Sequence, residues 1–351
     1  MKVAIDILPL QTSHQYRGIG AYTRNLVDAL QSIKLPNFSL QLIKQGKIPQ
    51  DCNLVHYPYF DLFWLTLPLR KVLPTVVTIH DVIPLVFPDK FPKGIKGWLK
   101  FQPQRFSLKS VSAVITDSQN SKKDISQYLE IPREKIFVVP LAPNKEFKPV
   151  KSTKLVNSIK VKYSLPDEFI LYVGDVNWNK NVEGLIKAMS NVKCQMSNVK
   201  LVLVGKAFED KNLKETRLIL QLIKELNLID QTKILGWVPR EDLVAICNLA
   251  TVYCQPSFYE GFGLPVLEAM ACGCPVVVAN TSSLSEICGN AAVMVNPQEV
   301  NEMGKELVRV IVDGELRRKL IEKGIEQIKK FSWKKVAEQT VEVYQKVLRF
   351  G

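Results

Sequence analysis

Residues 255–279 read Gln255-Pro-Ser-Phe-Tyr-Glu260-Gly261-Phe262-Gly263-Leu264-Pro265-Val-Leu-Glu268-Ala-Met-Ala-Cys-Gly273-Cys-Pro275-Val-Val-Val-Ala279. Apolar runs at Thr251–Cys254 and Val276–Ala279 predict two buried strands. Pro265 suits the first turn of a helix between them, and Gly273 suits the end of that helix. The stretch therefore predicts a parallel βαβ unit with a glycine-containing loop at the carboxyl end of its first strand.

This loop combines features that suit an anion with two carboxylates. Ligands of open α/β sheets bind at the carboxyl ends of the strands, and a helix N-terminus offers free N–H groups to an anion. Glu260 and Glu268 would repel an anion unless the same ligand also carries hydroxyl groups, which carboxylates bind well. A sugar nucleotide has both a diphosphate and hydroxyl groups, so the motif indicates that class of ligand.

The length of 351 residues is long for one core and sufficient for two domains. No apolar run reaches the ~20 residues that a membrane-spanning helix needs, and residues 1–6 predict a strand rather than a signal peptide. The seven cysteines contain no Cys-x-x-Cys pair, which favours reduced core residues over metal ligands. We therefore expect a cytoplasmic protein.

The net charge of +13 is compatible with nucleic acid, an anionic membrane, an anionic substrate or simply a basic surface. Lys and Arg are dispersed, and no zinc-finger, RRM or helix-turn-helix pattern is present, so we expect no nucleic-acid partner. Residues 93–106 mix cations with aromatic residues, and residues 57–69 are rich in aromatics. They predict either a peripheral membrane contact at the inner membrane face or an ordinary surface helix, and Gly97 and Pro103 favour the latter.

Strand and helix patterns alternate along both halves of the chain. The predicted strands are Val3–Ile7, Leu40–Ile43, Leu54–His56, Val76–Ile79, Ala113–Thr116, Ile136–Val139, Phe169–Val173, Val199–Val204, Lys233–Leu235, Thr251–Cys254, Val276–Val278 and Ala291–Val295. Between the halves, Pro140, Pro143 and Pro149 lead into a polar stretch, 151–158, whose composition predicts a linker. This alternation predicts two doubly wound α/β domains.

The string from Glu260 to Glu268, Glu-x7-Glu filled by Gly-Phe-Gly-Leu-Pro, resembles the signature of glycosyltransferase family 4. The resemblance extends from the first strand to the last helix and implies the GT-B fold, with two Rossmann-like domains facing a central cleft. It implies an acceptor-side domain at residues 1–160, completed by a helix at about 336–351, and a nucleotide-sugar donor domain at residues 161–335.

The resemblance also implies roles for the donor-binding residues. Glu268 would bind the ribose hydroxyls and Glu260 those of the transferred sugar, although Glu268 alone also fits a helix-stabilising acid in a first turn. Lys180 is the candidate cation for the diphosphate. The family has Arg where this chain has Asp175 or Asn179, so either Lys206 substitutes for it, or Lys180 and the helix N-terminus suffice. The expected donor-binding residues are Gly18, Gly20, Gly174, Asn179, Lys180, Lys206, Val238, Glu260, Gly261, Phe262, Gly263, Leu264 and Glu268.

On the acceptor side, His80 follows the strand Val76–Ile79 and resembles the active-site histidine of the family. We expect it to hydrogen-bond the donor sugar rather than to act as a general base, with Asp81 a candidate to hold its tautomer. Arg17 and Asp81 are the candidate acceptor-side residues. Ser118 is a candidate helix cap.

The resemblance implies a retaining transfer of a hexose, mannosyl-like or similar, from a nucleotide-diphosphate sugar. The acceptor would be a glycan or a lipid-linked saccharide in polysaccharide or cell-envelope synthesis. We expect His80, Glu260 and Lys180 to be catalytic, with no cofactor and no metal, because no Asp-x-Asp stands at a plausible strand end. The alternatives are a sugar-nucleotide epimerase of the same fold and a non-catalytic binding subunit, the latter suggested by the missing Arg near Lys180.

Overall fold

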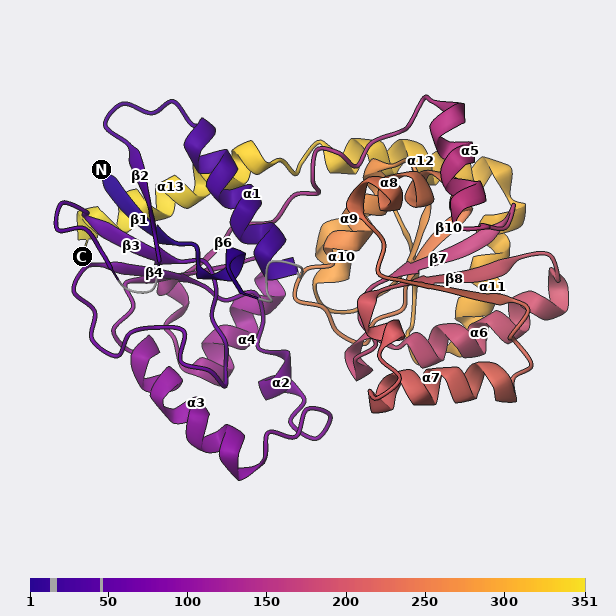
Figure 1. Ribbon diagram of the computed structural model, residues 1–351, viewed down its shortest axis with the longest axis horizontal. Coiled ribbons are helices and arrows are strands. Elements are labelled where there is room, and N and C mark those ends of the chain that lie inside the picture. The colour runs from indigo at the N-terminus through magenta and orange to yellow at the C-terminus, as the bar shows by residue number, and fades with distance from the viewer. Residues whose placement is uncertain (13–17, 45–46, 351) are drawn as a thin grey trace. The chain divides into compact units, whose positions relative to one another are not determined.

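A computed structural model describes residues 1–12, 18–44 and 47–350. They form two units, Met1–Ala142 with Phe331–Gly351, and Pro143–Lys330 (Figure 1). Each unit contains one six-stranded sheet in which all neighbouring strands are parallel. The twelve predicted strands are therefore confirmed, with ends that differ by at most two residues.

The sheet of the first unit has the order β2-β1-β3-β4-β5-β6. Its strands are β1 (Lys2–Asp6), β2 (Ser39–Ile43), β3 (Leu54–Tyr57), β4 (Thr75–Thr78), β5 (Ala113–Thr116) and β6 (Ile136–Val138). Its helices are α1 (Gly18–Ser32), α2 (Ile83–Val86), α3 (Gly94–Leu108), α4 (Gln119–Leu129) and α13 (Trp333–Phe350), with short 3-10 turns η1 (Leu8–Leu10) and η3 (Arg133–Lys135). The last helix, α13, packs against α1 on one face of this sheet, while α3 and α4 lie on the other (Figure 1).

The sheet of the second unit has the order β12-β11-β10-β7-β8-β9. Its strands are β7 (Phe169–Val173), β8 (Lys200–Val204), β9 (Thr232–Gly236), β10 (Val252–Gln255), β11 (Val276–Ala279) and β12 (Val293–Val295). Its helices are α5 (Thr153–Lys162), α6 (Val182–Gln195), α7 (Lys214–Glu225), α8 (Arg240–Leu249), α9 (Leu264–Ala271), α10 (Ser282–Cys288), α11 (Val300–Val312) and α12 (Gly314–Ile328), with 3-10 turns η4 (Trp178–Lys180) and η5 (Lys206–Glu209).

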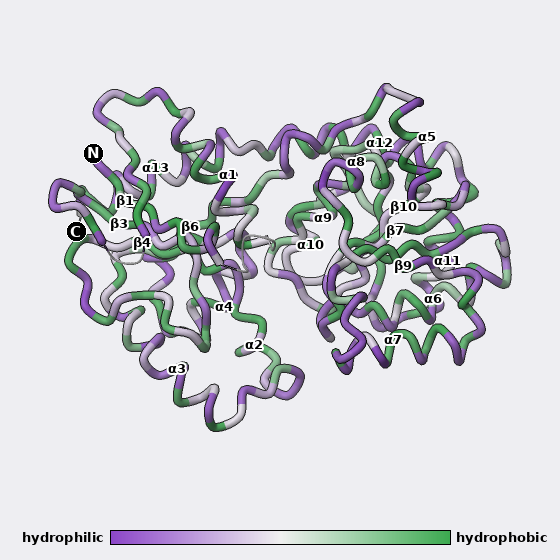
Figure 2. The backbone as a smooth tube through the Cα atoms, viewed as in Figure 1, coloured by the Kyte–Doolittle hydropathy of each residue, from purple (hydrophilic) through white to green (hydrophobic). Residues whose placement is uncertain are grey.

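The strands are apolar because helices cover both faces of each sheet. Strands β3, β4, β5, β10 and β11 are buried along their whole length, which is typical of parallel sheets. The covering helices are amphipathic instead. In Figure 2 the colour of α7 alternates along its length, and its buried residues Thr216, Ile219 and Ile223 recur at helical spacing.

The predicted linker agrees with the unit boundary among its prolines, but it is wrong for residues 151–158, because α5 begins at Thr153. The Ser152 side chain caps this helix by accepting a hydrogen bond from the Leu155 amide (3.3 Å). The stretch is polar because α5 buries only Ile159, so its composition reports exposure and not an absence of structure. The boundary between the two units lies earlier, at Ala142 and Pro143.

Each sheet contains a point at which the strand order reverses. In the first sheet β1 lies between β2 and β3, and in the second β7 lies between β8 and β10. The connections that leave two such neighbouring strands run in opposite directions, which opens a crevice at their carboxyl ends where ligands of α/β sheets bind. The loops after β1 and β3, and those after β7 and β10, are therefore the places to look for a site.

Candidate functional site

The loop after β10 is shaped by Gly263, which precedes α9. Gly263 has a φ of +105°, and a Cβ atom there would lie 2.7 Å from Leu284 Cδ2. Both the backbone conformation and the lack of space therefore require glycine. Leu264 then begins the helix, with Pro265 in its first turn. The predicted strand–loop–helix arrangement is confirmed at this position.

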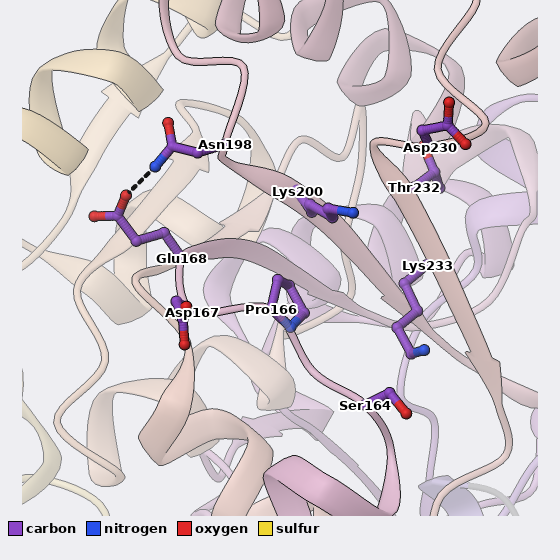
Figure 3. Close-up of a pocket in the computed structure, with 9 residues that line it drawn as sticks. All are labelled: Ser164, Pro166, Asp167, Glu168, Asn198, Lys200, Asp230, Thr232 and Lys233. Carbon is purple, nitrogen blue, oxygen red and sulfur yellow. Dashed lines mark hydrogen bonds between the residues drawn. The ribbon is translucent and has the colours of Figure 1, made fainter.

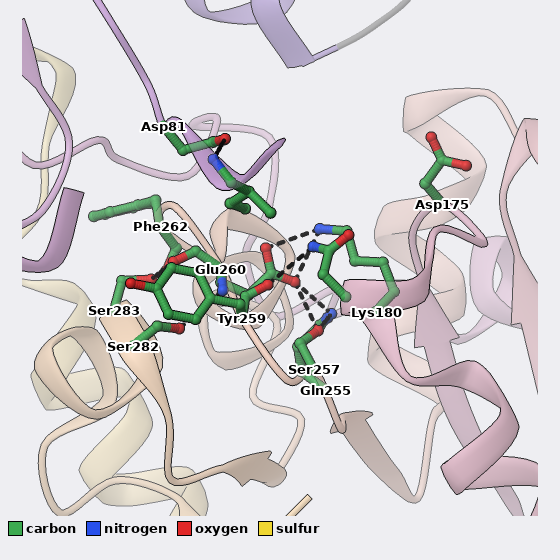
Figure 4. A network of polar contacts seen from close by, with 12 residues as sticks. Asp81, Asp175, Lys180, Gln255, Ser257, Tyr259, Glu260, Phe262, Ser282 and Ser283 are labelled. Carbon is green, nitrogen blue, oxygen red and sulfur yellow. Dashed lines mark hydrogen bonds and ion pairs between the residues drawn. The ribbon is translucent and has the colours of Figure 1, made fainter. Parts of the chain in front are cut away.

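Within this loop, the carboxylate of Glu260 is the centre of a buried polar network (Figure 4). Lys180 Nζ lies 2.9 Å from Glu260 Oε1 and 2.8 Å from Oε2. The same Oε1 accepts hydrogen bonds from Ser257 Oγ (2.7 Å) and Gln255 Nε2 (3.0 Å). Lys180 follows β7 and Glu260 follows β10, so this ion pair joins the two loops of the strand-order reversal.

The backbone of the loop is held in place by two serines of α10. The Glu260 amide donates to Ser282 Oγ (2.8 Å), and Ser283 Oγ lies 3.0 Å from the Glu260 carbonyl and 2.8 Å from that of Phe262. Gly261 and Phe262 are buried between these contacts. Local sequence pattern does not predict this role of Ser282 and Ser283, although they begin the helix after β11, the parallel neighbour of β10.

The loop after β7 approaches the strand end of β8 closely. A Cβ atom on Gly205 would lie 1.9 Å from the carbonyl oxygen of Gly174, so residue 205 has no room for a side chain. The buried amide group of Asn179 donates to the Tyr259 carbonyl (2.9 Å), and the Tyr259 amide donates to the Asn179 carbonyl (3.3 Å). Asn179 therefore fixes the loop that carries Glu260, while the side chain of Asp175 is exposed.

Glu268 lies in the second turn of α9, and no acidic residue occupies the first turn of this helix. The alternative explanation of Glu268 as a first-turn acid is therefore wrong. Its side chain is half-buried, and this burial raises the pKa of the carboxyl group to about 8, although the positive charge of Arg240 opposes the shift. The carboxylate would gain from a ligand that supplies hydrogen-bond donors.

In the first unit, His80 is bound by Asp117 rather than by Asp81. His80 Nδ1 lies 2.7 Å from Asp117 Oδ2, whereas Asp81 Oδ1 accepts a hydrogen bond from the Ile83 amide (3.0 Å) at the start of α2. Burial lowers the pKa of His80, but the charge of Asp117, its hydrogen bond and the charge of Asp81 outweigh burial and raise the pKa overall. His80 Nε2 is buried without a hydrogen-bond partner among the residues that the structure describes.

The order of the strands could have identified Asp117 as the partner of His80. Strands β4 and β5 are parallel neighbours with Thr78 opposite Ile115, so residues 80 and 117 stand at the same level beyond their ends. Ser118 caps α4 as predicted, because its hydroxyl accepts a hydrogen bond from the Ser121 amide (3.0 Å).

The remaining predicted residues are dispersed over several elements. Gly18 and Gly20 lie in the first turn of α1. Lys206 is exposed at the start of η5, and Val238 is buried just before α8. Arg17 lies outside the described residues.

A polar hollow of about 590 Å³ in the second unit is not the candidate site (Figure 3). Its lining residues are Ser164, Pro166, Asp167, Glu168, Asn198, Lys200, Asp230, Thr232 and Lys233. These residues lie around the amino ends of β7, β8 and β9, opposite to the edge where ligands of such sheets bind.

The two doubly wound units define the GT-B fold class, and comparisons with solved structures agree. A sucrose-phosphate synthase from Thermosynechococcus elongatus superposes with a TM-score of 0.78 at 21% identity and covers 100% of both chains. The Anabaena protein HepE, crystallised with UDP-glucose, superposes with a TM-score of 0.74 at 16% identity and covers 99% of this chain and 100% of its own.

Sequence comparisons identify the family within this class. Residues 157–327 match the family model described as glycosyl transferases group 1, and residues 9–145 match that of glycosyltransferase family 4. O-antigen chain mannosyltransferase B of Escherichia coli is 30% identical over 273 residues, which cover 77% of this chain and 70% of that protein. The chain therefore belongs to the family 4 glycosyltransferases.

A second relative is much longer than this chain. The serotype-specific mannosyltransferase WbdA of Escherichia coli is 29% identical over 293 residues, which cover 82% of this chain. The match covers 36% of WbdA, so the chain spans about a third of the length of that relative.

Proposed function

We propose that the protein is a glycosyltransferase that moves a hexose from a nucleotide-diphosphate sugar to a saccharide acceptor in polysaccharide or cell-envelope synthesis. The observation that carries this proposal is the ion pair between Lys180 and the buried Glu260 at the strand-order reversal of the second sheet. The family membership supports the reaction class, and two relatives named as mannosyltransferases support a mannosyl-like sugar. The UDP-glucose bound by HepE supports a nucleotide-sugar donor.

The donor would exchange the internal ion pair for its own contacts. Sugar hydroxyls bind to Glu260, the diphosphate draws Lys180, and the ribose hydroxyls bind to Glu268. Because the departing nucleotide diphosphate gains negative charge, Lys180 and the amide groups of the loop after β10 stabilise the transition state more than the ground state.

His80 would act as a hydrogen-bond donor to the sugar. Its Nδ1 is occupied by Asp117, so only Nε2 is available to a ligand. The raised pKa of His80 favours the protonated ring, which donates through Nε2 and is a poor general base. This supports the expected role of His80 as a binding group. We also propose retention of configuration and no requirement for a cofactor.

A nucleotide-sugar panel tests the proposal. The measurement is the melting temperature of the protein with UDP-, GDP-, ADP- and dTDP-hexoses, followed by transfer from the stabilising donor to oligosaccharides. Lack of stabilisation by every donor would contradict the proposal. Donor consumption that does not require an acceptor would favour an epimerase, and binding with no turnover would favour a non-catalytic subunit.

Metal independence has a separate test. We expect transfer to continue unchanged in excess EDTA, because Lys180 and the loop amides supply positive charge to the diphosphate. The control is the same reaction with added Mg²⁺ or Mn²⁺. Loss of activity in EDTA with recovery on metal addition would show that the expectation is wrong.

We further propose that the protein is cytoplasmic and contacts an anionic membrane through α3. This helix buries Phe101 and Leu108. Three of its large apolar residues are instead exposed to solvent: Ile95 by 81%, Trp98 by 52% and Leu99 by 57%. The same helix also carries lysines, and a helix that combines lysines with exposed apolar residues can bind anionic lipid. No helix of the described residues has the length and apolar character needed to cross a bilayer.

Vesicle sedimentation tests this contact. We expect binding to phosphatidylglycerol vesicles, weaker binding to phosphatidylcholine vesicles, and loss of binding in the double variant Ile95→Ser, Leu99→Ser. The variant Leu218→Ser, at an exposed leucine of α7, is the matched control. Equal binding of the double variant and the control would contradict the contact.

A further inference from the structure

The imidazole ring of His80 packs against Tyr22, a buried residue of α1. The two ring centroids lie 4.6 Å apart, and the ring planes are perpendicular. An edge-to-face arrangement of this kind is one of the favoured geometries for a pair of aromatic rings. His80 therefore has a second buried neighbour besides Asp117, and this neighbour acts through packing rather than through charge.

The hydrogen bond to Asp117 does not by itself fix the plane of the imidazole ring. It holds one ring atom, Nδ1 of His80, at 2.7 Å from Asp117 Oδ2, and the rest of the ring can still tilt about that contact. The torsion that turns a histidine ring about its Cβ–Cγ bond has broad energy wells, so it does not supply the missing constraint. The perpendicular ring of Tyr22 does, because a tilt would drive the imidazole into it.

Tyr22 can act as a fixed wall because its hydroxyl is tied to the same strand end. Tyr22 Oη lies 3.0 Å from Thr78 Oγ1, and Thr78 ends β4 just before His80. The Tyr22 side chain thus contacts Thr78 through its hydroxyl and His80 through its ring. Burial and the charge of Asp117 raise the pKa of Tyr22, so this hydroxyl keeps its proton.

The chain of hydrogen bonds continues to α13, the helix that packs against α1. Thr78 Oγ1 also lies 2.9 Å from His56 Nε2, and His56 Nδ1 lies 2.7 Å from the hydroxyl of Tyr344 on α13. Burial lowers the pKa of His56 to about 3, so its neutral ring donates through one nitrogen and accepts through the other. Trp333, which begins α13, places its ring centroid 6.2 Å from that of Tyr22. Side chains of β3, β4 and α13 therefore hold Tyr22 in place.

We infer that Tyr22 is a positioning residue of the transfer reaction, whose ring fixes the plane of the His80 imidazole so that Nε2 is directed at the bound sugar. The inference rests on the proposed function, in which His80 Nε2 donates to that sugar. Tyr22 itself does not need to touch the substrate. Because a hydrogen bond to a transition state depends on an orientation set in advance, loss of this wall should lower turnover more than donor affinity.

A double-mutant cycle on turnover tests the inference. We expect Tyr22→Leu, which removes the ring, to lower kcat about tenfold while the KM for the donor changes by less than about threefold. Tyr22→Phe keeps the ring and loses only the hydroxyl, so it should retain most of the activity. In the background of His80→Gln, Tyr22→Leu should have no further effect on kcat, because a positioning residue acts only through the group that it positions.

Tyr344→Leu is the matched control for the loss of a buried tyrosine. Tyr344 is fully buried at the other end of the same chain of hydrogen bonds, where its partner is His56. We expect Tyr344→Leu and Tyr22→Leu to lose similar amounts of the free energy of unfolding in urea, with the kcat of the control close to that of the wild type. Tyr22→Met, whose longer side chain leaves a smaller cavity, serves in the same cycle if the leucine variant does not fold.

NMR gives a readout that needs no turnover. The ring current of Tyr22 shifts the signals of the carbon-bound imidazole protons of His80, and Tyr22→Leu, but not Tyr22→Phe, should return them toward their values in the unfolded chain. Unchanged His80 signals in Tyr22→Leu, additive effects of Tyr22→Leu and His80→Gln on kcat, or an equal loss of kcat in Tyr344→Leu would each overturn the inference alone. Absence of turnover in the wild type would instead refute the proposed function, and the inference with it.

Discussion

The Glu260 carboxylate accepts hydrogen bonds from Lys180, Gln255 and Ser257. A buried carboxylate is stable only when such partners compensate its lost hydration. Glu260 is therefore fixed in place before any ligand arrives, so little orientation of this group is needed on binding.

Glu268 differs because its burial is poorly compensated. The pKa of its carboxyl group is about 8 in the folded protein against 4.5 ordinarily, so between these pH values the folded state holds a proton that the unfolded state releases. Stability should therefore fall as pH rises through this window. Glu268→Gln removes the titration. Between pH 5 and pH 8.5 we expect the free energy of unfolding of the variant to rise by roughly 2 kcal/mol relative to the wild type, about half of what the full shift would give, because the side chain is only half-buried.

Urea unfolding at the two pH values measures this gain. Glu286→Gln, at an exposed glutamate of α10, is the control. A stability difference between Glu268→Gln and wild type that does not change with pH would show that the Glu268 carboxyl titrates normally.

Asp117 should control the protonation of His80. Asp117→Asn removes the largest of the contributions that together outweigh burial, so we expect the pKa of His80 to fall below its ordinary value. NMR titration of the imidazole signals measures the pKa of His80, and the variant His80→Gln assigns the signal. A histidine with a raised pKa in the folded state stabilises that state below pH 6.5, and the stabilisation is lost as pH rises through the raised pKa. The difference in free energy of unfolding between wild type and Asp117→Asn should therefore shrink over that range. An unchanged His80 pKa would refute the role of Asp117.

At the scale of elements, the start of α9 depends on a glycine that no other residue can replace. Gly263→Ala places a Cβ 2.7 Å from Leu284 in a left-handed backbone conformation. We expect a loss of roughly 2–3 kcal/mol in the free energy of unfolding, together with weaker donor binding because the loop shifts.

Gly314→Ala is the matched control for this substitution. Gly314 begins α12, and the atom nearest to its added Cβ is Arg317 Nη2 at 3.9 Å. We expect this variant to be as stable as the wild type or slightly more stable, because alanine is the better helix former. If the two variants differed little in urea unfolding, the strain assigned to position 263 would be wrong.

The elements themselves were predictable where local pattern decides them. The apolar runs predicted all twelve strands, and Pro265 and Gly273 predicted both ends of α9. The polar segment at 151–158 was misinterpreted, because an exposed helix and a linker have similar compositions.

At the scale of the whole molecule, the partners of the site residues could not be predicted from local pattern. Contacts of Ser283 with Glu260 and of Asp117 with His80 join segments 23 and 37 residues apart. Only the strand order and register bring them together. The sequence therefore indicated the loops of the candidate site, but not the side chains that hold its residues in position.

Each sheet contains a comparable strand-order reversal, and we propose the donor site at that of β7 and β10. Two independent crevices of this kind suit a protein that brings two substrates together, which neither a simple binding module nor a nucleic-acid-binding protein requires. The Lys180–Glu260 pair is the feature that the donor assignment needs most.

The turnover number of Lys180→Ala with a saturating nucleotide-sugar donor tests this claim most directly, with Lys187→Ala on the exposed side of α6 as the control. We predict a decrease in kcat of about 100-fold or more for Lys180→Ala, because this cation faces the charge that develops on the departing diphosphate, and no change for the control. A kcat for Lys180→Ala within about twofold of wild type would contradict the account.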